Sequence, residues 1–123
     1  MAVARVVGAG LLVAIGLIHL SLAPTYILVA TYIGILFYVT CAVAWLSALA
    51  ILVGVRGAWL VGALLSAGTM SGLVLASTTG LPAFMDSLSA PLATLSLALE
   101  GGFLALYASA AIARRSPVLS GRR

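Results

Sequence analysis

The sequence predicts an all-α membrane protein whose four transmembrane helices form an up-down-up-down bundle with both termini in the cytoplasm. Three observations predict this fold. The 123 residues are 64% hydrophobic and only 7% charged, whereas soluble domains carry about 25% charged residues. Four stretches are apolar enough to cross a bilayer, and all six basic residues are arginines at or beyond the ends of those stretches. Because so short a chain cannot hide this much apolar surface from water, its solvent must be lipid.

The four predicted helices cover residues 3–23, 27–55, 58–77 and 90–113 of a single membrane domain, followed by a basic tail at 114–123. Each has the length of about 20 residues that a bilayer core requires. Pro24 lacks the N–H group that would continue a helix, and Arg56-Gly57 is typical of a tight turn. Pro91 suits the first turn of the last helix. Short links make consecutive helices antiparallel neighbours.

A secretory signal peptide is the alternative interpretation of the first helix. Arg5, an apolar run and Ser21-Leu22-Ala23 resemble a signal sequence with its cleavage site. However, Pro24 would hinder the peptidase, and the run exceeds the roughly 7–15 apolar residues of a signal peptide. We therefore expect a retained helix.

The arginines predict the orientation of the helices. With four spans, Arg5, Arg56, Arg114 and Arg115 all fall on one side, together with Arg122 and Arg123 in the tail. The other side carries only Asp86. Since basic residues are retained in the cytoplasm, we expect a multi-pass protein of the cell (plasma) membrane with its N- and C-termini inside.

Small residues at helical spacing predict how the helices pack. Lipid tails are as apolar as leucine, so helices in a bilayer associate through close backbone approach at small side chains. The predicted helix-packing positions are Gly8, Gly16, Gly62, Ser66, Gly68, Gly72, Ala76, Gly101, Ala105 and Ser109. Packing within the chain is the expected role, and a face that binds another copy is the alternative.

Glu100 is the most informative position in the sequence. It lies about ten residues into the last helix, roughly 15 Å along its axis. A charge near the bilayer centre costs about 2.5–3.5 kcal/mol, so we expect a neutral or paired carboxyl. His19 is the candidate partner if the first and last helices adjoin, and Ser96 and Tyr107 on the same face would complete a buried polar seam. The alternative is a neutral Glu100 bonded to a backbone carbonyl or hydroxyl.

The segment 78–90 joins the third and fourth helices on the side opposite the arginines. It is either an ordinary connection or a lid over an outward cavity next to His19. We expect Asp86 to anchor this segment in water.

The sequence also excludes several classes. No Gly-rich phosphate loop, nucleophile elbow or paired-carboxylate centre is present, so we expect no enzyme. No basic patch interleaved with aromatic residues predicts a nucleic-acid partner. Cys41 is alone, and one His, one Glu and one distant Cys fall short of a zinc or copper site. No cofactor is predicted; haem or copper at His19 is the alternative.

Four short motifs resemble the small uncharacterised four-helix integral membrane proteins of actinobacteria: His19-Leu20-x-Leu22-Ala23-Pro24, Gly34-x-x-Phe37, Ser77-Thr78-Thr79-Gly80-Leu81-Pro82 and Glu100. Proteins of that group carry a second His or an acidic cluster after the proline and an Arg before the turn. This chain has Thr25-Tyr26 and Thr78 there, and so lacks charged groups that an ion site would use. The resemblance implies the fold and no particular activity.

These observations lead to three functional expectations. The first is a non-catalytic subunit or assembly factor of a larger membrane complex of the respiratory or membrane-oxidase type. Its partners would be the lipid bilayer and other membrane-protein subunits, or a second copy of the chain. The second is an oligomeric small-solute or proton-coupled transporter that uses Glu100. The third is a haem- or copper-binding membrane protein that uses His19.

Overall fold

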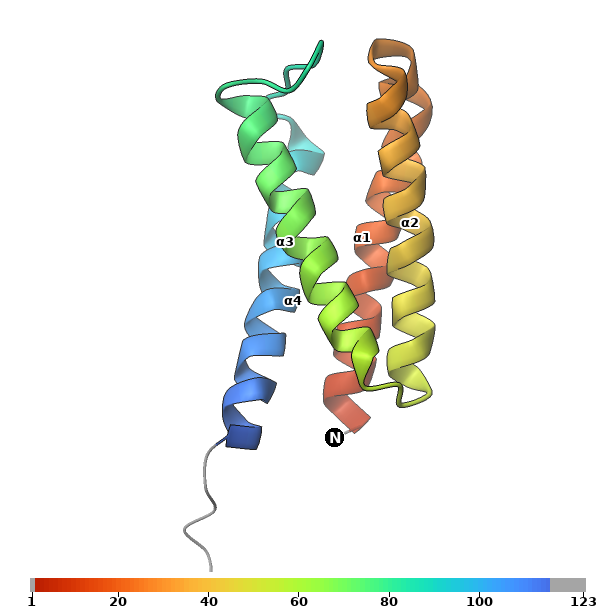
Figure 1. Cartoon of the computed structure of the whole chain (residues 1–123), viewed down its shortest axis with the longest axis vertical. Helices are drawn as coiled ribbons and strands as arrows, with labels where there is room; N and C mark the ends of the chain where they lie inside the picture. Colours follow the sequence, from red (N-terminus) through yellow and green to blue (C-terminus); the bar gives the residue numbers. More distant parts are fainter. Residues whose placement is uncertain (1, 116–123) are drawn as a thin grey trace, which may run out of the picture.

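The computed structural model describes residues 2–115, which form four long helices packed as an antiparallel bundle (Figure 1). Each helix packs against the next in the chain, and the last also packs against the first. All four are long and apolar enough to cross a membrane, so the predicted fold class is confirmed. The helices are α1 (Ala2–Val29), α2 (Thr31–Leu52), α3 (Gly57–Ser77) and α4 (Pro91–Arg115).

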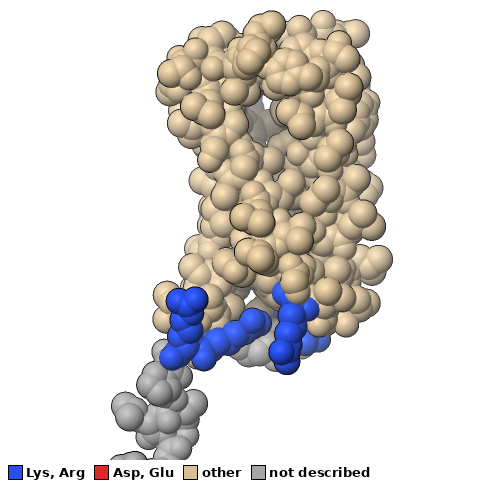
Figure 2. All heavy atoms as spheres, viewed as in Figure 1, with Lys and Arg blue, Asp and Glu red and all other residues tan. Residues whose placement is uncertain are grey.

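The bundle has two chemically different ends. The start of α1, the α2–α3 turn and the end of α4 lie together at one end, and the loop 78–90 lies at the other (Figure 1). Figure 2 shows the arginine side chains gathered at the first end. We call the half of the bundle nearest the arginines the arginine half and the other the loop half. Arg122 and Arg123 lie outside the described residues.

The predicted end of the first helix before Pro24 is wrong. Helix α1 continues through Pro24 to Val29, and Ala30 alone separates it from α2, with extended backbone angles φ −147° and ψ 111°. A proline removes one backbone hydrogen bond, which membrane helices tolerate when neighbouring groups satisfy the freed carbonyl. Helix α2 accordingly begins at Thr31 and ends at Leu52, whereas α3 and α4 match their predicted bounds within two residues.

Gly34 allows this one-residue turn between α1 and α2. A Cβ atom at Gly34 would lie 2.5 Å from the Cα atom of Ile27 in α1, closer than two carbon atoms that are not bonded can approach. Only glycine therefore fits where the two backbones meet. The resulting hairpin is the most extensively packed helix pair of the bundle.

In the arginine half, aromatic rings fill the space that glycines leave open. Trp59 lies over Gly8 and Phe103 over Gly62, and a Cβ atom at either glycine would come within 2.6 Å of the ring. Trp45 covers Gly16 in the same way and donates its indole N–H to the carbonyl of Val13 at 3.2 Å. The surrounding core is fully buried, with Leu12, Ile15, Ile51 and Phe103 no more than 1% exposed. The interior of this half is closely packed around these residues, and a smaller cavity of about 220 Å³ lies at its end beside Trp59, Tyr107 and Arg114.

The remaining predicted packing positions have mixed outcomes. Ser66 and Ala76 are buried, but no atom lies within 4 Å of a Cβ atom built at Gly68, Gly72 or Gly101. Ala105 and Ser109 are exposed on the outer face of α4. The prediction that these residues pack within the chain is thus wrong for Gly68, Gly72 and the stripe Gly101, Ala105 and Ser109. The spacing of small residues identifies a helix face, but not what lies opposite it.

Candidate functional site

A cavity of about 610 Å³ lies between the four helices in the loop half. Figure 2 shows an opening into the molecule at this level, between the α1–α2 pair and the α3–α4 pair. Most of the cavity wall is apolar, and a few polar side chains converge on it: His19, Tyr26, Thr40, Thr69, Asp86, Ser96 and Glu100. A volume of roughly 300–1,000 Å³ with apolar walls and a few convergent polar groups is typical of a small-molecule site.

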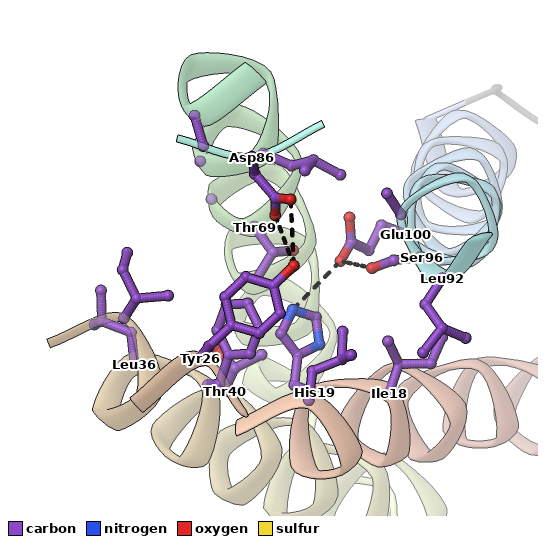
Figure 3. Close-up of a pocket in the computed structure, with 18 of the residues that line it drawn as sticks. Ile18, His19, Tyr26, Leu36, Thr40, Thr69, Asp86, Leu92, Ser96 and Glu100 are labelled. Carbon is purple, nitrogen blue, oxygen red and sulfur yellow. Dashed lines mark hydrogen bonds and ion pairs between the residues drawn. The ribbon is translucent and has the colours of Figure 1, made fainter. Parts of the chain in front are cut away.

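Glu100 is the most deeply buried polar group of the cavity. Its side chain is 1% exposed, and the Ser96 hydroxyl one turn earlier on α4 donates to its Oε1 atom at 2.8 Å (Figure 3). Its second oxygen, Oε2, has no hydrogen-bond partner of standard geometry within residues 2–115, although the Thr69 hydroxyl lies close enough to the carboxyl to interact with it. A buried oxygen without a partner loses the free energy of its hydration. Glu100 therefore has an unused acceptor beside the cavity.

His19 of α1 faces Glu100 through its Nε2 atom, which lies 4.0 Å from Oε1 (Figure 3). Its other ring nitrogen, Nδ1, lies 2.8 Å from the carbonyl oxygen of Ile15. Because a carbonyl can only accept, Nδ1 carries the hydrogen of this bond, and Nε2 is the nitrogen that gains or loses a proton. The ring of Phe37 packs edge-on against the imidazole at 5.0 Å and holds its orientation. Nε2 of His19 and Oε1 of Glu100 thus face each other just beyond hydrogen-bond distance.

The structure brings together three of the four residues of the predicted seam. His19, Ser96 and Glu100 meet because α1 and α4 adjoin. Tyr107 does not belong to this group; it packs against the core of the arginine half. Although it shares a helix face with Glu100, seven residues displace it by about 10 Å along the axis. The spacing in the sequence predicted the correct helix face, but it carried no information on where the cavity ends along that face.

Thr69 of α3 is a site residue that the sequence did not reveal. It lines the cavity near Glu100 (Figure 3), and its hydroxyl donates to the carbonyls of Leu65 and Ser66 at 3.0 and 3.1 Å. A threonine that bonds to its own helix is common in apolar segments. Nothing in the sequence distinguished it from the chain's other hydroxyl residues.

Phe103 lies beyond the cavity toward the arginine half. It follows Glu100 by one turn on α4, is completely buried, and fills the space above Gly62 beside Leu12. None of Phe103, Gly62 and Leu12 lines the cavity, so a closely packed region separates the cavity from the arginine end.

The loop 78–90 covers the opposite end of the cavity. Tyr26 near the end of α1 donates its hydroxyl to both carboxylate oxygens of Asp86, at 3.2 and 3.1 Å (Figure 3). The backbone N–H of Asp86 donates to the carbonyl of Ala76, and the Tyr32 hydroxyl donates to the carbonyl of Pro82. The expectation that Asp86 anchors the loop in water is wrong, because it is half-buried and lines the cavity. We call the Tyr26–Asp86 contact the latch.

A compact turn places the loop over the cavity. Leu81 and Phe84 exchange backbone hydrogen bonds of 2.8 and 3.0 Å, with Gly80 and Ala83 at positive φ. This turn directs the Phe84 ring inward, where it is 7% exposed and packs 5.5 Å from the ring of Tyr26. The geometry favours a lid over an ordinary connection.

No group of three or more His, Cys, Asp or Glu side chains within residues 2–115 could hold a metal ion. The fold and the site together define a small multi-pass membrane protein with a ligand-sized cavity that contains a buried carboxyl. A scan against protein-family models, a search of curated proteins and a search of solved structures find no match to this chain.

Proposed function

We propose that this protein is a small proton-coupled transporter, in which a solute bound in the cavity exchanges with a proton on the Glu100–His19 pair. The observation that carries the proposal is the unpartnered Oε2 atom of Glu100 beside a cavity of about 610 Å³. Ionisable residues at this depth in a membrane are rare and are associated with substrate and proton pathways. Most buried polar groups in proteins have a hydrogen-bond partner, so a buried carboxylate oxygen without one calls for a functional explanation.

The geometry supplies a reason for coupling. When the proton resides on the carboxyl, Glu100 is neutral and holds no cation. When the carboxyl is ionised, its Oε2 atom accepts from a solute, while Oε1 keeps the Ser96 hydroxyl and faces His19. Solute and proton then compete for one carboxyl, which is the condition for exchange of one against the other.

The closed floor supports one-sided access. Phe103 and its neighbours are closely packed between the cavity and the arginine end, so a solute in the cavity has no path to that end. Transport requires a second conformation in which this packing opens. We therefore assign the described conformation to one of the two states of an alternating cycle.

Proton flux in proteoliposomes tests this function. A pH-sensitive dye inside the vesicles reports proton movement when naphthylmethylamine, ethylnaphthalene or naphthoic acid is added outside. We expect at least one of these probes to drive flux with the wild-type chain. Glu100→Gln, which keeps the shape of the side chain and removes its proton, is expected to abolish the flux.

Two controls accompany this experiment. Ser96→Ala keeps the carboxyl and removes one hydrogen bond, worth about 1.5–3 kcal/mol to a charged group, so it should change the pH dependence without abolishing flux. Helical content and elution as a single species confirm that each variant folds. Equal flux in wild type and Glu100→Gln would refute the proposal.

A second candidate, the accessory subunit of a larger membrane complex, is favoured by one observation. The stripe Gly101, Ala105 and Ser109 lies on the outer face of α4 without packing inside the chain, and such stripes suit close contact with another helix. Extraction in mild detergent tests it: a stoichiometric partner lost on Ala105→Leu would support this candidate, and a partner-free chain would contradict it.

The membrane and the orientation belong to the same proposal. We assign the arginine end to the cytoplasm because basic residues are retained there, which places the loop 78–90 outside the cell. We likewise propose the plasma membrane from the same charge distribution, and a relationship to the actinobacterial group from the resemblance of the short sequence motifs. Neither candidate function involves catalysis, and haem or copper at His19 is left as the third alternative.

A further inference from the structure

We propose that the solute of this cavity is an amine dissolved in the bilayer, and that it reaches Glu100 sideways through a gap between α2 and α3. This inference rests on the proposed function and specifies its solute class and route.

The chemistry of the cavity selects an amine. Two carboxylates, Glu100 and Asp86, line it, and no Lys or Arg does. Asp86 is already engaged by Tyr26, so the free acceptor is Oε2 of Glu100. A protonated amine supplies both the hydrogen-bond donor and the charge that this oxygen lacks. The rings of Phe37 and Tyr26, 4.8 Å apart on the cavity wall, add an aromatic surface that favours a cation.

The apolar wall selects an amine with a hydrophobic body. Apart from the polar side chains already described, the cavity is lined by aliphatic and aromatic residues from all four helices. A small hydrophilic amine would leave that wall uncovered. An amine attached to an aromatic or branched hydrocarbon group would cover it, and the same hydrocarbon group would concentrate the molecule in the bilayer.

Three leucine and valine side chains mark a lateral gap. Leu36 and Val39 of α2 and Leu64 of α3 line the cavity, yet they are 52%, 50% and 64% exposed on the outside of the bundle. A side chain can line the cavity and also face the outside of the bundle only at the edge of an opening. Figure 2 shows this opening between the two helix pairs.

Two glycines widen the gap. Gly68 and Gly72 lie one turn apart on α3 and line the same cavity, and no atom lies within 4 Å of a Cβ atom built at either position. In the arginine half the corresponding space above glycine holds an aromatic ring. Here it is empty, and a side chain added at Gly68 would extend into the gap.

The depth of the gap places it in lipid rather than in water. Leu64 and Gly72 lie about 20 and 8 Å from the loop end of α3, from a rise of about 1.5 Å per residue. Most of this interval falls within a hydrocarbon core of about 30 Å. The aqueous route from the loop end is covered instead by Phe84 and the latch.

Blocking the gap tests the route. Wild type and Gly68→Leu are reconstituted in liposomes, and naphthylmethylamine is then added to the membrane. The rate of binding is followed by the infrared carbonyl band of Glu100. This band is identified by its loss in Glu100→Gln. We expect Gly68→Leu to slow binding about tenfold or more, as a barrier higher by about 1.4 kcal/mol would. Gly10→Leu is the matched control, because Gly10 also has no atom within 4 Å but faces outward on α1.

Two further variants test the same route from opposite directions. Leu64→Ala removes a side chain from the rim and should accelerate binding. Tyr32→Phe removes a hydrogen bond that holds the loop 78–90 at Pro82, lies outside the cavity lining, and should leave the rate unchanged. Binding of Gly68→Leu at the wild-type rate, or faster binding by Tyr32→Phe, would overturn the lateral route.

The solute class has its own test. We expect naphthylmethylamine to bind about tenfold to a hundredfold more tightly than ethylnaphthalene, since a charge-assisted hydrogen bond is worth about 1.5–3 kcal/mol. Equal affinity would overturn the amine while leaving the proposed function intact, because proton flux driven by naphthoic acid, whose neutral carboxyl can also donate to Oε2, would still support transport. Failure of the wild type to bind or respond to any of these probes would overturn both.

Discussion

The interior glycines of α1 and α3 have different neighbours in the two halves of the bundle. In the arginine half, Gly8, Gly16 and Gly62 each receive an aromatic ring from a neighbouring helix, and the packing around them is close. In the loop half, Gly68 and Gly72 receive nothing, and a cavity results. Glycine therefore allows close packing where an aromatic ring lies opposite it, and it leaves open space where no side chain does. What differs is the residue opposite the glycine, and this contrast separates a structural half from the half that holds the candidate site.

Truncating Phe103 should change the free energy of unfolding more than any other substitution that tests this contrast. Phe103→Ala should lower the free energy of unfolding by about 3–5 kcal/mol, the usual cost of removing a buried phenylalanine. The measurement is unfolding in mixed micelles of increasing denaturing-detergent fraction. Phe84→Ala is the matched variant in the loop half. It should cost clearly less, because one side of Phe84 already faces the cavity, and equal losses would contradict the distinction between the halves.

Adding the same side chain to two glycines of α3 gives the next largest effect. Gly62→Leu should destabilise the protein by about 1–3 kcal/mol, because the added atoms overlap the Phe103 ring. Gly68→Leu, six residues later, should leave the free energy of unfolding unchanged or raise it. The same micelle titration measures both variants. A similar loss at the two positions would show that the space above Gly68 is not empty.

Removing the latch hydroxyl gives the smallest effect. Tyr26→Phe loses the hydrogen bonds to the Asp86 carboxylate. A hydrogen bond to a charged group contributes about 1.5–3 kcal/mol when buried, and solvent screening at this half-buried pair reduces the contribution to about 0.5–1.5 kcal/mol. Amide hydrogen exchange should accelerate in the loop 78–90 and stay unchanged in the arginine half. Thr79→Ala serves as control, because its hydroxyl bonds only to the adjacent Gly80 carbonyl. Faster exchange throughout the bundle would contradict a local role for the latch.

Much of the fold was predictable because it depends on local chemistry. Long apolar segments must form helices in lipid, since no other segment conformation satisfies its own backbone there. The bounds of α3 and α4 follow from Arg56-Gly57 and the turn near Pro82, where the sequence changes character. Pro24 misled the prediction because the rule that proline ends a helix comes from helices in water. In α1 the apolar surroundings keep the helix continuous through that position.

The candidate site was predictable only in part. Glu100 and His19 stand out because each is a lone ionisable group in an apolar span, and their depths match. Ser96 followed from its spacing on the same face. The sequence could not show that Tyr107 lies outside the site and Thr69 inside it, because membership of the site depends on how far the cavity extends along the bundle axis. Asp86 was misplaced because its partner Tyr26 lies 60 positions away in the chain.

The sequence by itself determined the solvent of this protein, the number of its helices, the sidedness of its charge and the identity of its one deeply buried carboxyl. These properties depend on hydropathy and charge, which each segment carries independently of its neighbours. Only the tertiary structure decided that aromatic rings fill three glycine positions and leave Gly68 and Gly72 open. Whether a small residue produces contact or a cavity depends on the side chain that another helix brings opposite it. That pairing exists only once the bundle has formed.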